Sequence, residues 1–177
     1  MGVQYDKLTD EDTLFIQNQK LFFIASASDH EVNLSPKAYK TLKVLDAYHV
    51  LYADYPGSGN RVARDIREGG RVTLMWSAFE GKPNITRLFC KGELIEKDTP
   101  EFDAYYSHFN GIAKSSLRRL ILFTIEKVES SCGMSVPKYT YVQESDALRS
   151  WVKNQANEGT LKNYIQEHEI PKDLGIS

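Results

Sequence analysis

Residues 71–96 read RVTLMWSAFEGKPNITRLFCKGELIE, and this stretch decides the fold. Apolar side chains recur at every second position of its first part, so Val72, Leu74 and Trp76 fall on one face of a strand. EGKPN supplies a turn, and residues 85–96 return as a second, long strand. The two strands are expected to form an antiparallel hairpin, which a sheet of parallel strands joined by helices does not contain.

The rest of the chain adds strands in hairpins and only short helices. LFFIASA (21–27) is continuously apolar and predicts a strand buried on both faces. VNLS begins a further strand, which Pro36 is expected to end because proline lacks an amide donor. Other strands are predicted at 48–54 and 117–128, and helices at about 10–19, 60–68, 100–108, 145–155 and 160–168. With about six strands and no regular alternation with long helices, the pattern favours a mainly β fold, a small antiparallel barrel with peripheral helices.

Composition indicates a single globular domain and excludes several classes of partner. The 177 residues are 41% hydrophobic, and the formal net charge of −2 gives nucleic acid no electrostatic support. No apolar run approaches the roughly 20 residues that span a bilayer, and the polar start predicts no signal peptide. Cys90 and Cys132 lie far apart, so both are expected to be reduced in a cytoplasmic protein, Cys132 as a buried loop cysteine. The four histidines lie in separate segments, and no metal site is predicted.

The loop YPGSGNR (55–61) comes directly before a predicted helix and has two interpretations. It lacks the third glycine of a dinucleotide fingerprint, yet a helix start attracts phosphate. Asn60 can donate a hydrogen bond, Arg61 can hold two oxygens, and Arg64 adds a second cation one turn later. The alternative is a plain turn before a solvated helix whose arginines pair with its own carboxylates. The local sequence leaves both interpretations open.

Two other polar positions are candidates for a site. VNLSPKA (32–38) places Ser35 and Lys37 at a strand end, where they can bind an anion or a planar heterocycle, or simply lie in solvent. Arg87 lies inside the strand ITRLFC on an apolar face, and an arginine buried there needs a partner. That partner is a carboxylate, a second subunit or a ligand.

The order of these segments is more informative than any one of them. LFFIASA, VNLSPKA, VLYADYPGSGNRVARDI, GRVTLMWSAFEGKPNITRLFCKG and SCGMSVP follow one another within residues 10–137. In this order they resemble the pyridoxamine 5′-phosphate oxidase-like family of FMN-binding split β-barrel proteins, and most of all its small uncharacterised members. The resemblance implies a split-barrel core over 10–137 and leaves 138–177 as a C-terminal helical extension of the same domain.

In that family two subunits pack their barrels together and build each FMN site at their interface. The resemblance therefore implies a homodimer with noncovalent FMN as the cofactor. Carried over by motif, the residues expected to bind FMN are Ser35 and Lys37 in the groove, Asn60, Arg61 and Arg64 at the phosphate, and Arg87 beside the flavin ring. Residues 76–79 and the loop 132–137 are expected to close the groove from the partner chain.

The implied function is that of a flavoprotein oxidoreductase acting on an unidentified small molecule. Pyridoxamine phosphate oxidases bind their substrate's phosphate with an arginine-containing C-terminal motif. The corresponding SCGMSVPKYTYVQESDALRSW (131–151) has no equivalent, so that particular reaction is not expected. No side chain is assigned as a catalytic acid or base. A non-catalytic module that binds flavin, haem or deazaflavin is the alternative, and a ligand-free dimeric barrel is a third hypothesis.

Overall fold

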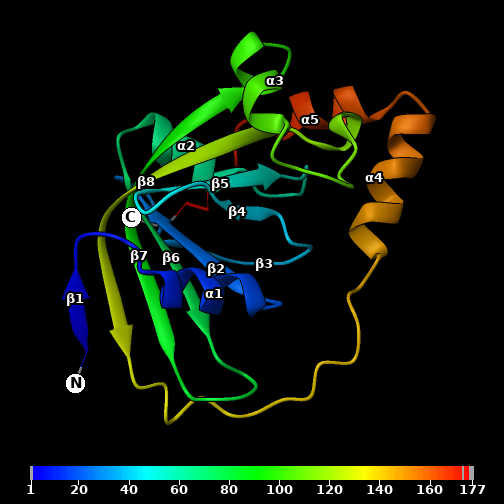
Figure 1. The fold of residues 1–177 in the computed structure, drawn as a ribbon. Helices are drawn as coiled ribbons and strands as arrows, with labels where there is room; N and C mark the ends of the chain where they lie inside the picture. Colours follow the sequence, from blue (N-terminus) through cyan, green and yellow to red (C-terminus); the bar gives the residue numbers. More distant parts are fainter. Residues whose placement is uncertain (1, 173, 176–177) are drawn as a thin grey trace.

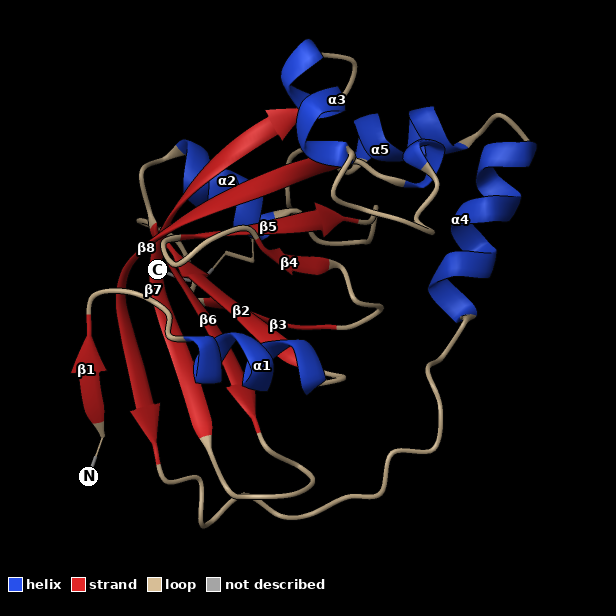
Figure 2. Cartoon of the chain, in the orientation of Figure 1, coloured by secondary structure: helices blue, strands red, loops and turns tan. Residues whose placement is uncertain are grey.

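The computed structural model describes residues 2–172, 174 and 175, and its main feature is one eight-stranded antiparallel sheet (Figure 1). The strands are β1 (Val3–Tyr5), β2 (Phe22–Ala27), β3 (Asn33–Lys37), β4 (Leu42–Val44), β5 (His49–Asp54), β6 (Arg71–Ser77), β7 (Ile85–Glu96) and β8 (Arg119–Ser131). They lie in the order β3-β2-β6-β7-β8-β5-β4, and β1 pairs with β8. The helices are α1 (Asp10–Asn18), α2 (Arg61–Arg67), α3 (Pro100–Tyr106), α4 (Ala147–Asn157) and α5 (Leu161–Glu167), with a 3₁₀ turn at Lys114–Ser116. Figure 2 shows the helices around the sheet rather than between its strands.

The predicted hairpin is confirmed and forms the centre of the sheet. β6 pairs with β7 in a register that sets Val72 opposite Cys90 and Leu74 opposite Leu88. The alternation along β6 buries Val72, Leu74 and Trp76, as the sequence pattern requires. β7 continues beyond β6 and pairs along its whole length with β8.

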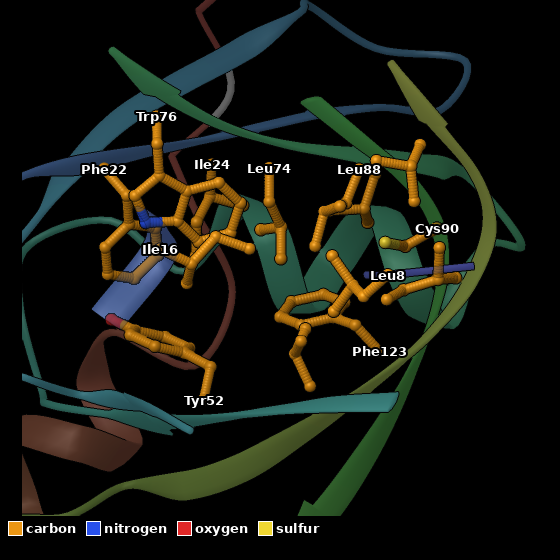
Figure 3. Packing of buried hydrophobic residues seen from close by; sticks show 14 of the residues in the cluster. Leu8, Ile16, Phe22, Ile24, Tyr52, Leu74, Trp76, Leu88, Cys90 and Phe123 are labelled. Atoms are coloured by element: carbon orange, nitrogen blue, oxygen red, sulfur yellow. The ribbon is translucent and has the colours of Figure 1, made fainter. Parts of the chain in front are cut away.

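Aromatic contacts show that the sheet curls until distant strands meet across the core (Figure 3). Phe22 on β2 stacks on Trp76 with ring centroids 5.5 Å apart, and it meets Tyr52 on β5 edge-to-face at 6.0 Å. Three strands separate β2 from β5 in the sheet order, so this contact requires strong curvature. The outermost strands, β3 and β4, each pair with a single neighbour in the described chain, which leaves the barrel split. The predicted fold class, a split β-barrel with peripheral helices, is confirmed.

Short helices cover the half-barrel, and all five predicted helices are present. α1 begins at a capping box, in which the Asp12 amide donates to the Thr9 hydroxyl and the Thr9 amide donates to the Asp12 carboxylate. α3 packs Phe102 into a second core cluster that also contains Leu117. α4 and α5 follow a long connection that leaves the end of β8 (Figure 1). None of the helices within the described residues is long and apolar enough to cross a membrane.

The structure corrects four details of the sequence-based predictions. β1 and β4, of three residues each, are too short for their patterns to be detected, so eight strands replace the predicted six. Pro36 lies inside β3 rather than ending it, because β3 is an edge strand and its outer side requires no amide donor. β2 is not buried on both faces, since its side chains alternate between buried and half-buried. Cys132 is exposed, whereas Cys90 lies in the core.

Candidate functional site

A groove of about 610 Å³ opens between β3 at one edge of the sheet and β5 near the other. The loop that joins β5 to α2, and the first turn of α2, line one end of it. Four of the six predicted site residues line this groove: Ser35, Lys37, Asn60 and Arg61. They come from two segments that are distant in sequence, and the curl of the sheet brings them together.

Lys37 and Asp54 face the groove from opposite walls. Burial lowers the pKa of Lys37, and the Asp54 carboxylate partly offsets this effect. Burial raises the pKa of Asp54, and the charges of Lys37 and Arg118 oppose that rise. Lys37 Nζ also lies 6.0 Å from the centroid of the Tyr52 ring. The groove thus contains a poorly hydrated cation whose charge is supported by one nearby carboxylate.

Arg61 and Arg64 share the carboxylate of Glu31. Arg61 Nε donates to Glu31, Arg64 Nη1 donates to it at 3.2 Å, and the Arg61 hydrogen bond is the main cause that lowers the pKa of Glu31 to about 2. Arg64 also donates two hydrogen bonds to Asp65, at 2.9 and 2.8 Å. Arg61 Nη2 donates to the backbone carbonyl of Lys172 at 3.4 Å. Arg61 therefore lines the groove, while Arg64 is held between two carboxylates outside it.

A chain of hydrogen bonds joins the β3 wall of the groove to α2. Ser35 Oγ donates to Asn33 Oδ1 at 3.0 Å, and Asn33 Nδ2 donates to Ser26 Oγ at 3.2 Å. Ser26 Oγ in turn donates to Asp65 at 2.6 Å. Because the Ser35 hydroxyl donates its hydrogen to Asn33, its oxygen can still accept a hydrogen bond from a ligand.

The segment after α5 covers the start of α2. Asn60 is buried, and its Nδ2 donates to the backbone carbonyl of Glu169 at 2.7 Å. The Glu169 carboxylate accepts from Arg67 and, at 2.8 and 2.7 Å, from Arg119. Burial pushes the pKa of Glu169 upward, but the hydrogen bonds from Arg119 and Arg67 lower it overall. One amide proton of Asn60 is therefore already used within the chain.

Arg118 supports the groove without lining it, and the sequence analysis missed this role. It is 3% exposed, its Nη2 donates to the carbonyl of Gly57 at 3.0 Å, and its amide donates to the carbonyl of Asp54 at 2.8 Å. Arg118 thereby holds the loop 55–61 against the end of β5. Its Nε has no hydrogen-bond partner among the described residues. The available signal was the pair of arginines directly before an apolar strand, because charges at such a position need partners.

Arg87 lies on β7 and does not line the groove of its own chain. Its Nη1 donates to Glu129 and to the Ser131 hydroxyl, each at 3.2 Å. Of the three kinds of partner considered for Arg87, the structure shows a carboxylate. No cluster of three or more histidine, cysteine or acidic side chains suited to a metal ion lies within the described part of the chain.

Comparison with known proteins shows the family. The model for the pyridoxamine 5′-phosphate oxidase family matches residues 8–132. The chain belongs to this family. The pyridoxamine 5′-phosphate oxidase family protein ustO of Aspergillus flavus is 32% identical over 179 residues, which cover 97% of this chain and 72% of that protein.

Solved structures of two bacterial proteins share the fold. A candidate pyridoxamine 5′-phosphate oxidase from Lactobacillus delbrueckii superposes with a TM-score of 0.54 at 19% identity, over 70% of this chain and 98% of its own. HupZ of Group A Streptococcus gives a TM-score of 0.51 at 14% identity, over 68% and 92% of the two chains. At these identities the comparison shows the fold alone.

The match to the pyridoxamine 5′-phosphate oxidase family ends before α4 and α5. The residues that line the groove from β3, β5 and α2 lie within the matched region. Glu169 and Lys172, which contact Asn60 and Arg61, lie outside it. A C-terminal segment outside the family model therefore forms part of the rim of the groove.

Proposed function

We propose that this protein binds FMN noncovalently in the groove and performs a redox reaction on a small molecule. The observation that carries the proposal is the convergence of Ser35, Lys37, Asn60 and Arg61 on one groove. The groove volume of about 610 Å³ lies inside the range of about 300–1,000 Å³ typical of small-molecule sites. Membership of a family named for an oxidase supports a redox role.

The charges in the groove fit an anionic cofactor. Lys37 and Arg61 are the cations among the described lining residues, against Asp54 as the carboxylate. Among the described residues no partner takes the hydrogens of Arg61 Nη1 or the second amide hydrogen of Asn60, so both are offered to a phosphate group. When bound, FMN supplies the redox chemistry, and these side chains supply binding, orientation and charge.

We also propose a cytoplasmic homodimer of a single domain, with a core over 10–137 and an extension over 138–177. Arg87 lies outside the groove of its own chain, so a contact between Arg87 and the flavin ring requires a second subunit. The same holds for closure of the groove by the loop 132–137. Arg64 assists phosphate binding indirectly in this arrangement, by holding the Glu31 carboxylate that Arg61 also contacts.

Titration of the full chain with FMN tests the cofactor. Binding should quench the fluorescence of FMN, and Arg61→Ala should weaken binding by about 1–3 kcal/mol, the cost of a lost charge-assisted contact. Arg71→Ala is the matched control, because Arg71 is an exposed arginine on β6 that pairs with Glu126. A wild-type chain that leaves both the visible spectrum and the fluorescence of FMN unchanged would refute the proposal.

Turnover distinguishes an oxidoreductase from a carrier or sensor. An oxidoreductase with bound FMN should consume NAD(P)H or an oxidisable substrate steadily. A chain that binds FMN without such consumption is a carrier or sensor, and one that prefers haem or deazaflavin in the same titration belongs to the alternative class.

A further inference from the structure

A second cavity, of about 580 Å³, adjoins the groove. Its walls are the turn between β3 and β4, the segment 109–116 and helix α4. Tyr39 and Tyr55 line both this cavity and the groove, so the two spaces share one aromatic wall. The centroids of the Tyr39 and Tyr55 rings lie 6.2 Å apart.

Four cations line this second cavity: Lys40, Lys43, Arg149 and Lys153. None of its described lining residues is an aspartate or a glutamate. Arg149 pairs with Glu144 at 3.2 Å, but Lys40, Lys43 and Lys153 form no ion pair within the described chain. Three unpaired lysines around one cavity give it a positive potential, although the protein as a whole has a net charge of −2.

The shared wall is held in an unusual conformation. Tyr39 and Lys40 both have positive φ, 65° and 52°, which is uncommon for residues with a side chain and is concentrated at binding sites. The Arg149 guanidinium lies 4.3 Å from the centroid of the Tyr39 ring, and its Nη2 donates to the Tyr39 carbonyl at 3.2 Å. Helix α4 therefore fixes the turn that borders both the cavity and the groove.

We propose that this lysine cavity (lined by Lys40, Lys43 and Lys153) binds an anionic small molecule through its carboxylate or phosphate group. Tyr39, Tyr55 and Phe109 offer aromatic surface to the rest of the ligand. Because Tyr39 and Tyr55 line both spaces, the bound anion lies next to the groove, and it is assigned as the substrate of the redox reaction. That last assignment, unlike the anion site itself, rests on the proposed function.

Calorimetric titration with phenyl phosphate, benzoate and neutral benzyl alcohol tests the site, using the full chain with and without FMN. Lys43→Gln and Lys153→Gln change cations that come from β4 and from α4. Each should raise the Kd of the preferred anion about tenfold, the effect of losing one charged hydrogen-bond donor. Lys82→Gln, in the exposed turn between β6 and β7, should leave that Kd unchanged. The tighter of phenyl phosphate and benzoate identifies the ligand's acidic group.

An equal Kd in wild type and in both lysine variants would overturn the proposal, as would benzyl alcohol binding as tightly as the anions. FMN titrations of the same preparations separate the two proposals. If FMN does not bind while phenyl phosphate binds with the expected dependence on the lysines, the anion site stands and the flavoprotein proposal falls. If FMN binds and the anions do not, the flavoprotein proposal stands and the anion site falls.

Discussion

Replacing Asp65 should reveal how strongly α2 is tied to the sheet beside the groove. Its carboxylate is fully buried and accepts from Ser26 at 2.6 Å, Ser28 at 3.1 Å and Arg64 at 2.9 and 2.8 Å. Asp65→Ala removes this acceptor from two serine hydroxyls and from Arg64, whose poorly exposed guanidinium keeps Glu31 as its carboxylate partner. Breaking a buried ion pair in this way costs about 3–5 kcal/mol of unfolding free energy.

Urea denaturation measures this loss directly. With a slope of about 2 kcal/mol per molar urea, the midpoint should fall by about 2 M. Glu68→Gln is the control, since Glu68 directly follows α2 but pairs with His30 across 3.2 Å at an exposed position. Glu68→Gln should lower the free energy of unfolding by less than about 1 kcal/mol. If Asp65→Ala lowers the free energy of unfolding by less than about 1 kcal/mol at an unchanged slope, the contacts of the Asp65 carboxylate contribute little to stability.

Three further outcomes are expected. Gly70→Ala should lower the melting temperature sharply or prevent folding, because the added Cβ would lie 2.2 Å from the carbonyl oxygen of Ala27. The pKa of Glu31 is lowered from 4.5 to about 2 in the folded state, so its contribution to stability is complete above about pH 4.5 and is lost as the pH falls towards 2. The urea midpoint should therefore fall more between pH 5 and pH 3 in wild type than in Glu31→Gln, when each midpoint is expressed relative to the same protein at pH 7. Cys132 should react with a thiol reagent in the native protein, whereas Cys90 is 1% exposed, burial raises its pKa, and it should react only on unfolding.

Each of these outcomes has a control or a contrary result. Gly81→Ala adds its Cβ in open space at a φ of 72°, so it tests the left-handed backbone without a clash and should cost only about 1 kcal/mol. An equal effect of the two glycine substitutions would contradict the steric explanation. A Glu31→Gln variant with the same acid sensitivity as wild type would exclude Glu31 as a source of it. Rapid labelling of both thiols in the native state would contradict the burial of Cys90.

The sequence predicted the parts of this fold that depend on local periodicity. The hairpin of β6 and β7 followed from alternation, and Ser35, Lys37, Asn60 and Arg61 were identified from two short motifs. Short elements escaped prediction because three residues cannot display a period. Pro36 was misassigned because a proline is excluded only from strands with neighbours on both sides, and the sequence does not show which strand is at the edge.

The partners of the site residues were beyond prediction because they are distant in sequence. Glu31 lies 30 residues from Arg61, and Glu169 lies 109 residues from Asn60. Nothing in the local pattern around either residue indicates these contacts, since they depend on how the sheet curls and where the last helix ends. The same limit applies to Arg87, whose pairing with Glu129 follows from the register of β7 and β8.

The contact between Asn60 and Glu169 also constrains the order in which the groove is completed during synthesis. Chains emerge from the ribosome with their N-terminal part first, and domains begin to fold as they emerge. The loop that carries Asn60 must wait for 109 further residues before its amide meets the carbonyl that it binds. A nascent chain halted before residue 169 would therefore have its central strands in place and the rim of its groove still open to solvent.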